Sequence, residues 1–426
     1  MLDIKLFRET PEVVKESEKK RFKDTKNVDL VIKYDTEWRD SAQEVQDIRQ
    51  KINQLGEKVS NLKKEKKPAK KEIEEMSKLS AKVKELEVKS EELIKQRDEI
   101  RYKVGNILHK DVPVSKTEDG NVTVRTWGKI PKFNFDIKAH ADLVIDLDLA
   151  EIERASKLVG ARFYFLKNDA VMLNFAMLRL ALDIMLKHKF TPFWTPYMLK
   201  KEYMKGAAEL GDFEQQLYAI KDEDLFLIAT SEQMLASLHA DEVIPETELP
   251  KPYTAYSACF RREAGSHGKD TKGIFRVHQF DKIEQFVLCA PKDSWDWHEK
   301  MVKISEEVFQ ALEIPYRIVL IASGEMNDNG SKKYDLEGWF PSQNTYRELG
   351  SATNCLDYQA RKLNIKIGKY GGEKEVLHTL NNTALATERA ICAIIENHQQ
   401  KDGSVKLPKA LIPYMGGITE LKPKKK

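Results

Sequence analysis

The most chemically suggestive stretch of the sequence runs from Cys259 to Leu288, where two β-like runs flank a loop rich in glycine and polar residues. Residues two apart share one face of a strand, so Arg261 and Glu263 are predicted to point the same way. On the returning run the same spacing groups Arg276, His278, Phe280 and Glu284. If the runs pair antiparallel, one surface carries two arginines, two carboxylates and an aromatic ring.

A surface of that composition suits a ligand that is both anionic and flat. Arginine presents a planar, permanently charged fork that matches phosphate or carboxylate oxygens. An aromatic ring beside an arginine can hold a flat base between them. The alternative interpretation is a solvated sheet face with cross-strand ion pairs. His267 and His278 have no cysteine or aspartate at zinc-ligand spacing around them, so no zinc is expected, and Cys259 is predicted to be buried.

The elements that must position these residues are mostly short β-like runs. They span residues 225–229, 253–263, 274–288, 316–322, 344–350 and 376–380. The runs alternate with loops more than with helices, which indicates an antiparallel sheet with helices packed on it. One such amphipathic helix is predicted from the spacing of Val171, Phe175, Leu178, Leu182 and Met185. A last helix is predicted at about 384–399, and the fold class is therefore α+β.

A second kind of pattern occupies residues 31–110, where charge is densest. Apolar or neutral residues recur there at alternating steps of three and four, at Val31, Tyr34, Trp38, Ser41, Val45, Ile48, Ile52, Leu55, Val59 and Leu62. This heptad is typical of a coiled coil. Pro68 interrupts it, and the register then resumes from Met76 to Ile107. Two heptad helices joined by a short break predict an antiparallel coiled-coil hairpin, an arm that projects from the N-terminal region.

The turn of this predicted hairpin is strongly basic. Residues 58–71 carry a net charge of +6 from one glutamate and seven lysines, Lys58, Lys63, Lys64, Lys66, Lys67, Lys70 and Lys71. Lysines on a projecting tip suit the phosphates of a nucleic acid, where counterion release drives binding. No aromatic residue lies near the tip, so backbone contact is indicated rather than base stacking. A dimerisation coiled coil, or a solvated spacer, is the alternative reading of the heptads.

Composition excludes several classes of protein. The chain has 426 residues and a net charge of +3, so it is not basic as a whole. No apolar run approaches the ~18 residues that a membrane span needs. Four cysteines without a CxxC pair argue against a disulfide scaffold or a zinc ribbon. The start, MLDIKLFRETPE, reads as neither a secretory signal nor a transit peptide. A soluble protein of a reducing compartment, the cytoplasm, is expected.

Several strings of the sequence occur in the order of a known family. TSEQ at 230–233, FRREAGSHGKDTKGIFRVHQF at 260–280 and LNNTALATERAICAIIEN at 380–397 resemble the serine-pocket element, motif 2 and motif 3 of class II aminoacyl-tRNA synthetases. KFTPFWTPYMLKKEYM, with Pro196, resembles motif 1. In detail the chain is similar to the seryl-tRNA synthetases, in their eukaryotic cytosolic and archaeal-like form, over nearly its whole length.

The resemblance implies a reaction in two steps. The carboxylate of L-serine attacks the α-phosphate of ATP, and the 3′ ribose of tRNA-Ser, or of tRNA-Sec where present, then takes the seryl group. Positioning and charge stabilisation would do most of this work. The implied domains are a tRNA-binding region with the arm at 1–110, a connector at 111–168, a class II catalytic domain at 169–420 that forms a homodimer, and a basic tail at 421–426.

The resemblance also implies roles for residues of an ATP site. Arg261 would contact the α-phosphate and the serine carboxylate, and Glu263 would accept from the adenine amino group. Phe280 and Arg389 would cover the two faces of adenine, and Arg276 would hold the far phosphates. Arg261, Glu263, Arg276 and Arg389 are the implied catalytic group. The implied ATP contacts are Arg261, Arg262, Glu263, Arg276, Val277, His278, Gln279, Phe280, Glu348, Leu349, Gly350, Ser351 and Arg389.

Two further sites are implied. Glu348 and Ser351 would give oxygen ligands to Mg²⁺. The serine pocket would comprise Thr230, Ser231, Glu232, Arg261, Glu284, Asn381 and Thr383. Such a pocket rejects alanine because its polar groups would be left unpaired, and rejects threonine by steric tightness. Gly350 departs from the family pattern, which has a β-branched residue there, and is expected to loosen its strand.

Other functions stay open at this point. A different class II synthetase, or a paralogue that activates serine for a carrier other than tRNA, would share these motifs, although a small carrier would not need a basic-tipped arm. A catalytically silent RNA-binding or scaffold protein would keep only the fold, and the intact Arg261, Glu263, Glu284, Glu348 and Arg389 argue against it. The +6 tip and the +4 tail leave −7 for the rest of the chain, so the small net charge averages a basic probe against an acidic body.

Overall fold

The computed structural model describes residues 1–207, 216–263, 272–368 and 372–423. The chain divides into two compact units, Leu2–Gly105 and Asn106–Lys426, with Met1 belonging to the second. We call them the arm unit and the sheet unit and describe each by itself.

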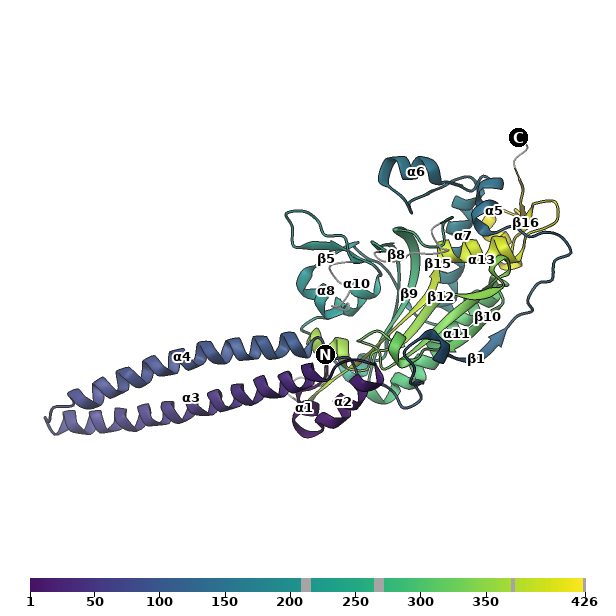
Figure 1. The fold of residues 1–426 in the computed structure, drawn as a ribbon. Helices are drawn as coiled ribbons and strands as arrows, with labels where there is room; N and C mark the ends of the chain where they lie inside the picture. The colour runs from purple at the N-terminus through teal and green to yellow at the C-terminus, as the bar shows by residue number, and fades with distance from the viewer. Residues whose placement is uncertain (208–215, 264–271, 369–371, 424–426) are drawn as a thin grey trace. The chain divides into compact units, whose positions relative to one another are not determined.

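The arm unit is helical (Figure 1). Its helices are α1 (Ile4–Glu9), α2 (Pro11–Lys20), α3 (Lys26–Lys64) and α4 (Lys70–Arg101). The 39 residues of α3 extend ~58 Å at ~1.5 Å per residue. The predicted antiparallel hairpin is confirmed, with its break at Pro68. The predicted end of the second helix was wrong: α4 stops at Arg101 rather than at Ile107, although Val104 is still fully buried.

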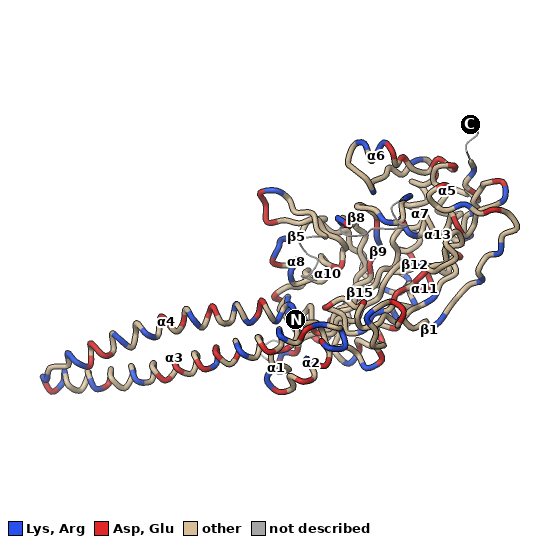
Figure 2. The backbone as a smooth tube through the Cα atoms, viewed as in Figure 1, with Lys and Arg blue, Asp and Glu red and all other residues tan. Residues whose placement is uncertain are grey.

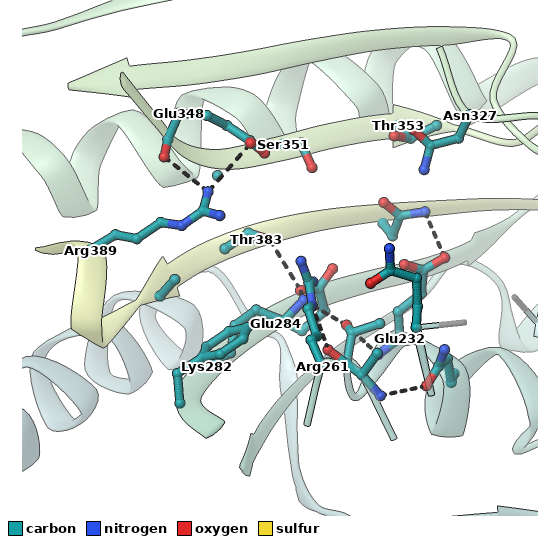
Figure 3. Close-up of a pocket in the computed structure, with 18 of the residues that line it drawn as sticks. Glu232, Arg261, Lys282, Glu284, Asn327, Glu348, Ser351, Thr353, Thr383 and Arg389 are labelled. Atoms are coloured by element: carbon teal, nitrogen blue, oxygen red, sulfur yellow. Dashed lines mark hydrogen bonds and ion pairs between the residues drawn. The ribbon is translucent and has the colours of Figure 1, made fainter. Parts of the chain in front are cut away.

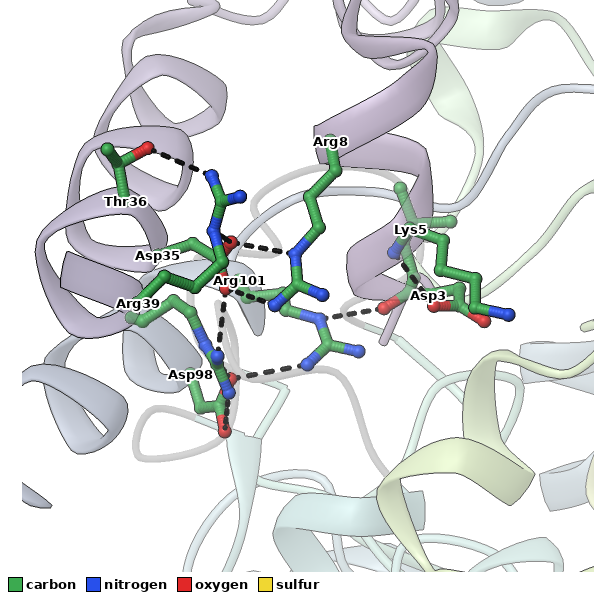
Figure 4. Close-up of polar contacts among 10 residues, drawn as sticks. Asp3, Lys5, Arg8, Asp35, Thr36, Arg39, Asp98 and Arg101 are labelled. Atoms are coloured by element: carbon green, nitrogen blue, oxygen red, sulfur yellow. Dashed lines mark hydrogen bonds and ion pairs between the residues drawn. The ribbon is translucent and has the colours of Figure 1, made fainter. Parts of the chain in front are cut away.

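One buried carboxylate ties the base of the hairpin together (Figure 4). Asp35 on α3 is 2% exposed and accepts two hydrogen bonds of 2.8 Å from the Nε and Nη2 atoms of Arg8 on α1. Arg97 on α4 donates to the same carboxylate at 3.0 Å, and Arg39 lies 3.2 Å from it. Because Asp35 touches three helices, its charge fixes how α1, α3 and α4 meet.

Charge along the hairpin is mixed, and its turn is basic (Figure 2). All seven lysines between residues 58 and 71 are exposed. Two of them have acidic partners, since Lys58 pairs with Glu72 at 3.0 Å and Lys67 with Glu65 at 2.8 Å. Because all seven side chains are exposed, a partner in solution can reach them, including the two that are in ion pairs.

The sheet unit is built on eight strands in the order β1-β10-β11-β12-β15-β9-β8-β4 (Figure 1). All neighbours are antiparallel except β4 and β8, which run parallel. In sheet order the strands are Val122–Trp127, Tyr316–Leu320, Lys332–Phe340, Thr345–Asn354, His378–Ala386, Gln279–Cys289, Lys251–Phe260 and Thr191–Trp194. The α+β class and the antiparallel sheet are confirmed. Residues 122–127, from the region expected to be a connector, supply an edge strand.

Helices pack on both faces of this sheet, and the core on the cavity face contains Phe286 and Leu288 of β9 together with residues of three helices. The helices of this unit are α5 (His140–Asp146), α6 (Ile152–Val159), α7 (Asp169–Lys187), α8 (Lys201–Ala207), α10 (Glu232–Ser237), α11 (Ser294–Ala311), α12 (Tyr358–Lys362) and α13 (Thr387–Asn397). Gln285 on β9 and Asn382 on β15 both donate to Met301 O and Ser305 Oγ of α11. Because side chains alternate along a strand, their neighbours on β9 and β15 face away from α11.

Short strands complete the unit. They are β2 (Ala150–Glu151), β3 (Phe165–Leu166), β5 (Met198–Lys200), β6 (Leu225–Leu227), β7 (Val243–Ile244), β13 (Lys366–Gly368), β14 (Lys374–Val376), β16 (Val405–Lys406) and β17 (Glu420–Leu421). Within the described ranges, none of the helices is both long and apolar enough to cross a membrane.

Helix α7 exists as predicted, but its predicted apolar face was partly wrong. Phe175 is 59% exposed, whereas Leu173 and Met177 are fully buried. This helix is apolar nearly all round, so spacing alone could not decide which side meets α11 and α13. Phe175 and Met172, which is 48% exposed, form an outward apolar strip.

Replacing Asp35 by alanine is expected to destabilise the arm unit by about 3 kcal/mol, because Arg8 and Arg97 would both lose this buried carboxylate and Arg97 would keep only Asp98. Hydrogen exchange of the full chain, followed by mass spectrometry over peptides of α3 and α4, measures the loss. Asp40→Ala, at an exposed position of the same helix, is the control and should leave exchange unchanged. Equal exchange in both variants would contradict the role given to Asp35.

Candidate active site

A cavity of about 410 Å³ lies on the face of the sheet that α11 leaves free. Its walls come from β9, β12 and β15, from the start of α10 and from the residues that follow β8 (Figure 3). Most of the predicted ATP and serine contacts line it: Thr230, Glu232, Arg261, Glu263, Phe280, Glu284, Glu348, Leu349, Gly350, Ser351, Asn381, Thr383 and Arg389. Residues as far apart in the sequence as Thr230 and Arg389 thus line the same cavity.

The floor of the cavity carries a buried ion pair on β9. Lys282 Nζ lies 2.6 Å from a Glu284 carboxylate oxygen and donates to Thr230 Oγ1 at 2.6 Å. The two side chains are 5% and 2% exposed. Lys282 was not among the predicted residues, although it lies between Phe280 and Glu284 on the same face, and this alternation was the signal that could have found it.

A second carboxylate, Glu232, lies beside this pair. It accepts hydrogen bonds from Asn381 Nδ2 at 3.0 Å and from Gln359 Nε2 at 2.8 Å. Burial, and then the negative charge of Glu284, raise the pKa of Glu232 to about 7. Near neutral pH the free protein therefore holds this carboxyl as a mixture of acid and carboxylate.

Arg261 lies where β8 ends. Its Nε donates to Ala229 O at 3.3 Å, and its guanidinium carbon lies 5.3 Å from the centre of the Phe280 ring. The permanent charge is thus next to both the aromatic surface and the carboxylates of the floor.

The predicted strand positions around Arg261 need correction. The ladder between β8 and β9 ends at the pair Phe260 and Gln279, so Arg261, Glu263, Arg276 and His278 lie beyond the strands. Glu263 has φ +48°, in the left-handed region, which no strand residue adopts. Part of the expected grouping still arises, because Arg276 Nη1 lies 3.7 Å from the Glu263 carboxylate, although Arg276 and His278 do not line the cavity. His267 lies outside the described residues.

Arg389, at the start of α13, is held by two neighbours. Its Nη1 donates to the Glu348 carbonyl oxygen at 2.9 Å and lies 3.3 Å from the Glu348 carboxylate. Its guanidinium carbon also lies 5.3 Å from the centre of the Phe275 ring. Partial burial works against ionisation of Glu348, but the positive charges of Arg389 and Lys333 outweigh it and lower its pKa.

Strand β12 bends where it passes the cavity. Its pairing with β11 shifts at Leu349, so Glu348 opposes Glu337 and Gly350 opposes Leu336. Gly350 is buried, and a side-chain carbon there would lie 3.0 Å from Thr383 O and 3.1 Å from Thr383 Cβ. The strand remains continuous through this position, and the glycine admits the close approach of β15.

Some predicted contacts lie away from the cavity lining. Six described residues are in this group: Ser231, Arg262, Arg276, Val277, His278 and Gln279. Val277 is 2% exposed and belongs to the hydrophobic core. Ser231 is fully buried in the turn before α10. Contacts of these residues with a ligand stay predictions.

Sequence reasoning missed further polar groups on the walls, among them Asn327, Lys333 and Glu388. Lys333 alternates with Asp335 on β11, a signal of the same kind as that for Lys282. Burial, opposed mainly by the charge of Arg389, raises the pKa of Glu388 to about 7. Asn327 comes from a loop that has no periodicity. In the described part of the chain, no three His, Cys, Asp or Glu side chains gather in a way that could hold a metal ion.

Comparison with known proteins gives two family matches and close full-length relatives. A model of the seryl-tRNA synthetase N-terminal domain matches residues 1–108, and a model of the class II synthetase core domain (G, H, P, S and T) matches residues 215–398. A serine–tRNA ligase of Methanosphaera stadtmanae is 51% identical over 425 residues, with both chains covered completely.

Two solved structures are similar over the whole chain. One is a seryl-tRNA synthetase from Pyrococcus horikoshii complexed with ATP, with a TM-score of 0.96, 43% identity and complete coverage of both chains. The other is a cytoplasmic serine–tRNA ligase from Naegleria fowleri in complex with AMP, with a TM-score of 0.89 and 40% identity over 100% of this chain and 99% of that one.

Replacing Glu232 by glutamine is expected to stabilise the free protein at pH 8 but not at pH 4. The folded-state pKa of about 7 lies above the ordinary 4.5, so the unsubstituted protein loses stability as the pH rises from 4.5 to 7, and the loss is constant above pH 7. Below pH 4.5 both states are protonated and the cost vanishes. The difference should therefore grow with pH to the order of 3 kcal/mol.

Urea unfolding of the two proteins at pH 4, 6 and 8 measures this difference. Glu246→Gln, at an exposed position, should show no such trend and controls for the loss of one negative charge. A stability difference for Glu232→Gln that does not vary with pH would contradict the raised pKa.

Proposed function

Because the chain belongs to the seryl-tRNA synthetase family, we propose that it is a class II serine–tRNA ligase, which activates L-serine with ATP and transfers the seryl group to tRNA-Ser. The observation that carries the proposal is the cavity that gathers Arg261, Glu284, Asn381 and Arg389 in a chain 51% identical to a serine–tRNA ligase throughout its length. An RNA-binding scaffold would have no need to keep this cavity.

Arg261 would work at the reacting atoms. The serine carboxylate must approach the α-phosphate, and both are anions. A guanidinium between them offsets their repulsion and stabilises the charge that develops as pyrophosphate leaves. Its position 5.3 Å from Phe280 supports this assignment, because the base of the same nucleotide could then lie on the ring. Glu263 would accept from the adenine amino group, with Arg276 beside it.

The serine end of the cavity would be the one built around Glu232 and Glu284. Their carboxylates suit the ammonium group and the hydroxyl of serine, and an ammonium beside Glu232 would favour its ionised form. Asn381 and Thr383 already hydrogen bond to these carboxylates, at 3.0 and 3.4 Å. Lys282 keeps Glu284 in place through the 2.6 Å ion pair.

Glu348 and Ser351 fit the Mg²⁺ expected with ATP. Both are oxygen donors on β12, both line the cavity, and the lowered pKa of Glu348 keeps it anionic. Bound Mg²⁺ would neutralise phosphate charge. Since Arg389 already lies 3.3 Å from the Glu348 carboxylate, it would have to share or release that carboxylate when the nucleotide enters.

The arm and the outer surface would serve the larger partner. The exposed lysines of the hairpin turn would clamp tRNA-Ser through its backbone, and tRNA-Sec is a second candidate substrate of the same clamp. Trp194 on β4 is 78% exposed and Phe175 on α7 59%, which supports a homodimer formed through this edge of the sheet unit. The likeness to a cytoplasmic ligase supports a cytoplasmic location.

The deciding experiment is ATP–pyrophosphate exchange with each of the twenty amino acids. Serine is expected to drive exchange, alanine and threonine far less. Absence of serine-dependent exchange would overturn the proposal, and exchange driven by another amino acid would point to a different class II synthetase.

Replacing Arg261 by alanine should reduce serine-dependent exchange about 10²- to 10³-fold, as expected when one charge-stabilising group is removed from a reacting centre. Arg49→Ala, a 63% exposed arginine on the arm, is the control. Circular dichroism should show both variants folded. Exchange within threefold of the unchanged protein would refute the role of Arg261.

The clamp can be tested with two matched sets of five substitutions to glutamine. The first set takes tip lysines outside the two ion pairs, Lys63, Lys64, Lys66, Lys70 and Lys71; the second takes exposed lysines along the helices, Lys51, Lys78, Lys84, Lys89 and Lys95. We expect the tip set to lower kcat/KM for tRNA charging about tenfold or more and to flatten its salt dependence, with exchange unchanged. Equal effects of the two sets would remove the tip from the proposal.

A further inference from the structure

Arg162 and Phe163, which follow α6, contact Glu263 just after β8 and His278 just before β9. Arg162 O accepts from His278 N at 3.1 Å, and Arg162 Nη1 donates to Glu263 O at 3.2 Å. The ring of Phe163 lies 5.1 Å from that of His278. This segment comes from the region expected to be a connector, so nothing in the motifs pointed to it.

His278, the residue before β9, contacts Arg261 through two hydrogen bonds. Its Nδ1–H donates to Arg261 O at 2.8 Å, and its carbonyl accepts from Arg261 N at 2.9 Å. Arg162 thus hydrogen bonds to Glu263 after β8 and to His278 before β9, and His278 in turn hydrogen bonds to Arg261. The chain from Arg261 to Glu263 is fixed by backbone hydrogen bonds rather than by a strand ladder.

The backbone of this arrangement is held in an unfavourable conformation. Arg162 has φ +64° and Glu263 has φ +48°, both in the left-handed region that side chains other than glycine seldom adopt. Such residues persist only where their surroundings determine them, and they concentrate at functional sites. Here the two left-handed residues contact each other, and one of them lines the cavity.

We infer that Arg162 is a positioning residue that sets the direction of the Glu263 carboxylate toward the base of the nucleotide. The inference rests on the proposed function, because it requires that Glu263 read the adenine amino group. Arg162 Nη1 donates to the backbone carbonyl of Glu263 at 3.2 Å. Arg276, at 3.7 Å, is the cation beside that carboxylate. Arg162 therefore acts through backbone geometry, and the adenine contact depends on it.

This role predicts a specific defect. Inosine triphosphate carries an oxygen where ATP carries the amino group, so a correctly placed Glu263 rejects it. When Arg162 is replaced by methionine, Glu263 can leave its left-handed conformation and its carboxylate moves. The KM for ATP should rise about tenfold, and the preference for ATP over inosine triphosphate should fall by a similar factor. The KM for serine should change less than twofold.

The experiment measures serine-dependent pyrophosphate exchange with ATP and with inosine triphosphate. Arg154→Met is the matched control, because Arg154 lies on α6, is 77% exposed and pairs with Glu151. Arg162→Lys keeps a cation and a donor and should recover part of the preference. Phe163→Leu, which keeps Arg162 but removes the ring beside His278, gives a second variant should Arg162→Met fold poorly, and should also weaken the preference.

The outcomes separate this inference from the proposed function. Exchange by the unchanged protein tests the function alone. An unchanged preference for ATP in folded Arg162→Met, or a parallel rise in KM for serine and ATP together with loss of thermal stability, would overturn the positioning role. A loss of preference confined to the Arg162 and Phe163 variants, with Arg154→Met unaffected, would establish it.

Discussion

The cost of holding carboxylates away from water shapes the cavity at the centre of the eight-stranded sheet. Glu232, Glu284 and Glu388 all lie on its walls, and desolvation raises the pKa of Glu232 and Glu388. Lys282 pairs with Glu284 at 2.6 Å, whereas the pKa values of Glu232 and Glu388 both rise to about 7. Individual cations lie next to individual carboxylates here, as Lys282 does to Glu284 and Arg389 to Glu348. A substrate that brings an ammonium group would complete the match.

The sheet makes this matching possible because it fixes direction along each strand. On β9, Lys282 and Glu284 face the cavity while Gln285 reaches α11. On β15 the order is the same, with Asn381 toward the cavity and Asn382 toward α11. The amide nitrogens of Gln285 and Asn382 both donate to α11, so the strands cannot slide without breaking these contacts and those of the cavity face. After Phe260 the chain leaves the strand ladder, and Arg261 and Glu263 are held by separate hydrogen bonds.

Sequence reasoning succeeded where the determinants are local. The heptads from Val31 onward and Pro68 predict α3 and the turn because helix periodicity and a missing N–H act within a few residues. It failed where partners are distant. The left-handed conformation of Glu263 depends on Arg162, 101 residues earlier, and glutamate carries no sign of it. The side of α7 that turns inward depends on α11 and α13. Glu232 and Asn381, 149 residues apart, could be grouped only through the resemblance to a family.

The close packing of Gly350 against Thr383 ties two positions of the sequence together over evolutionary time. A β-branched residue at 350 would push on Thr383, whose carbonyl oxygen already accepts from Ser305 Oγ at 3.1 Å and cannot easily retreat. A substitution at Gly350 therefore changes the packing at Thr383, and a substitution at Thr383 changes the space at Gly350. In a protein with glycine at 350, a return to the β-branched residue of the family pattern is therefore constrained by Thr383, which lies where that side chain would be.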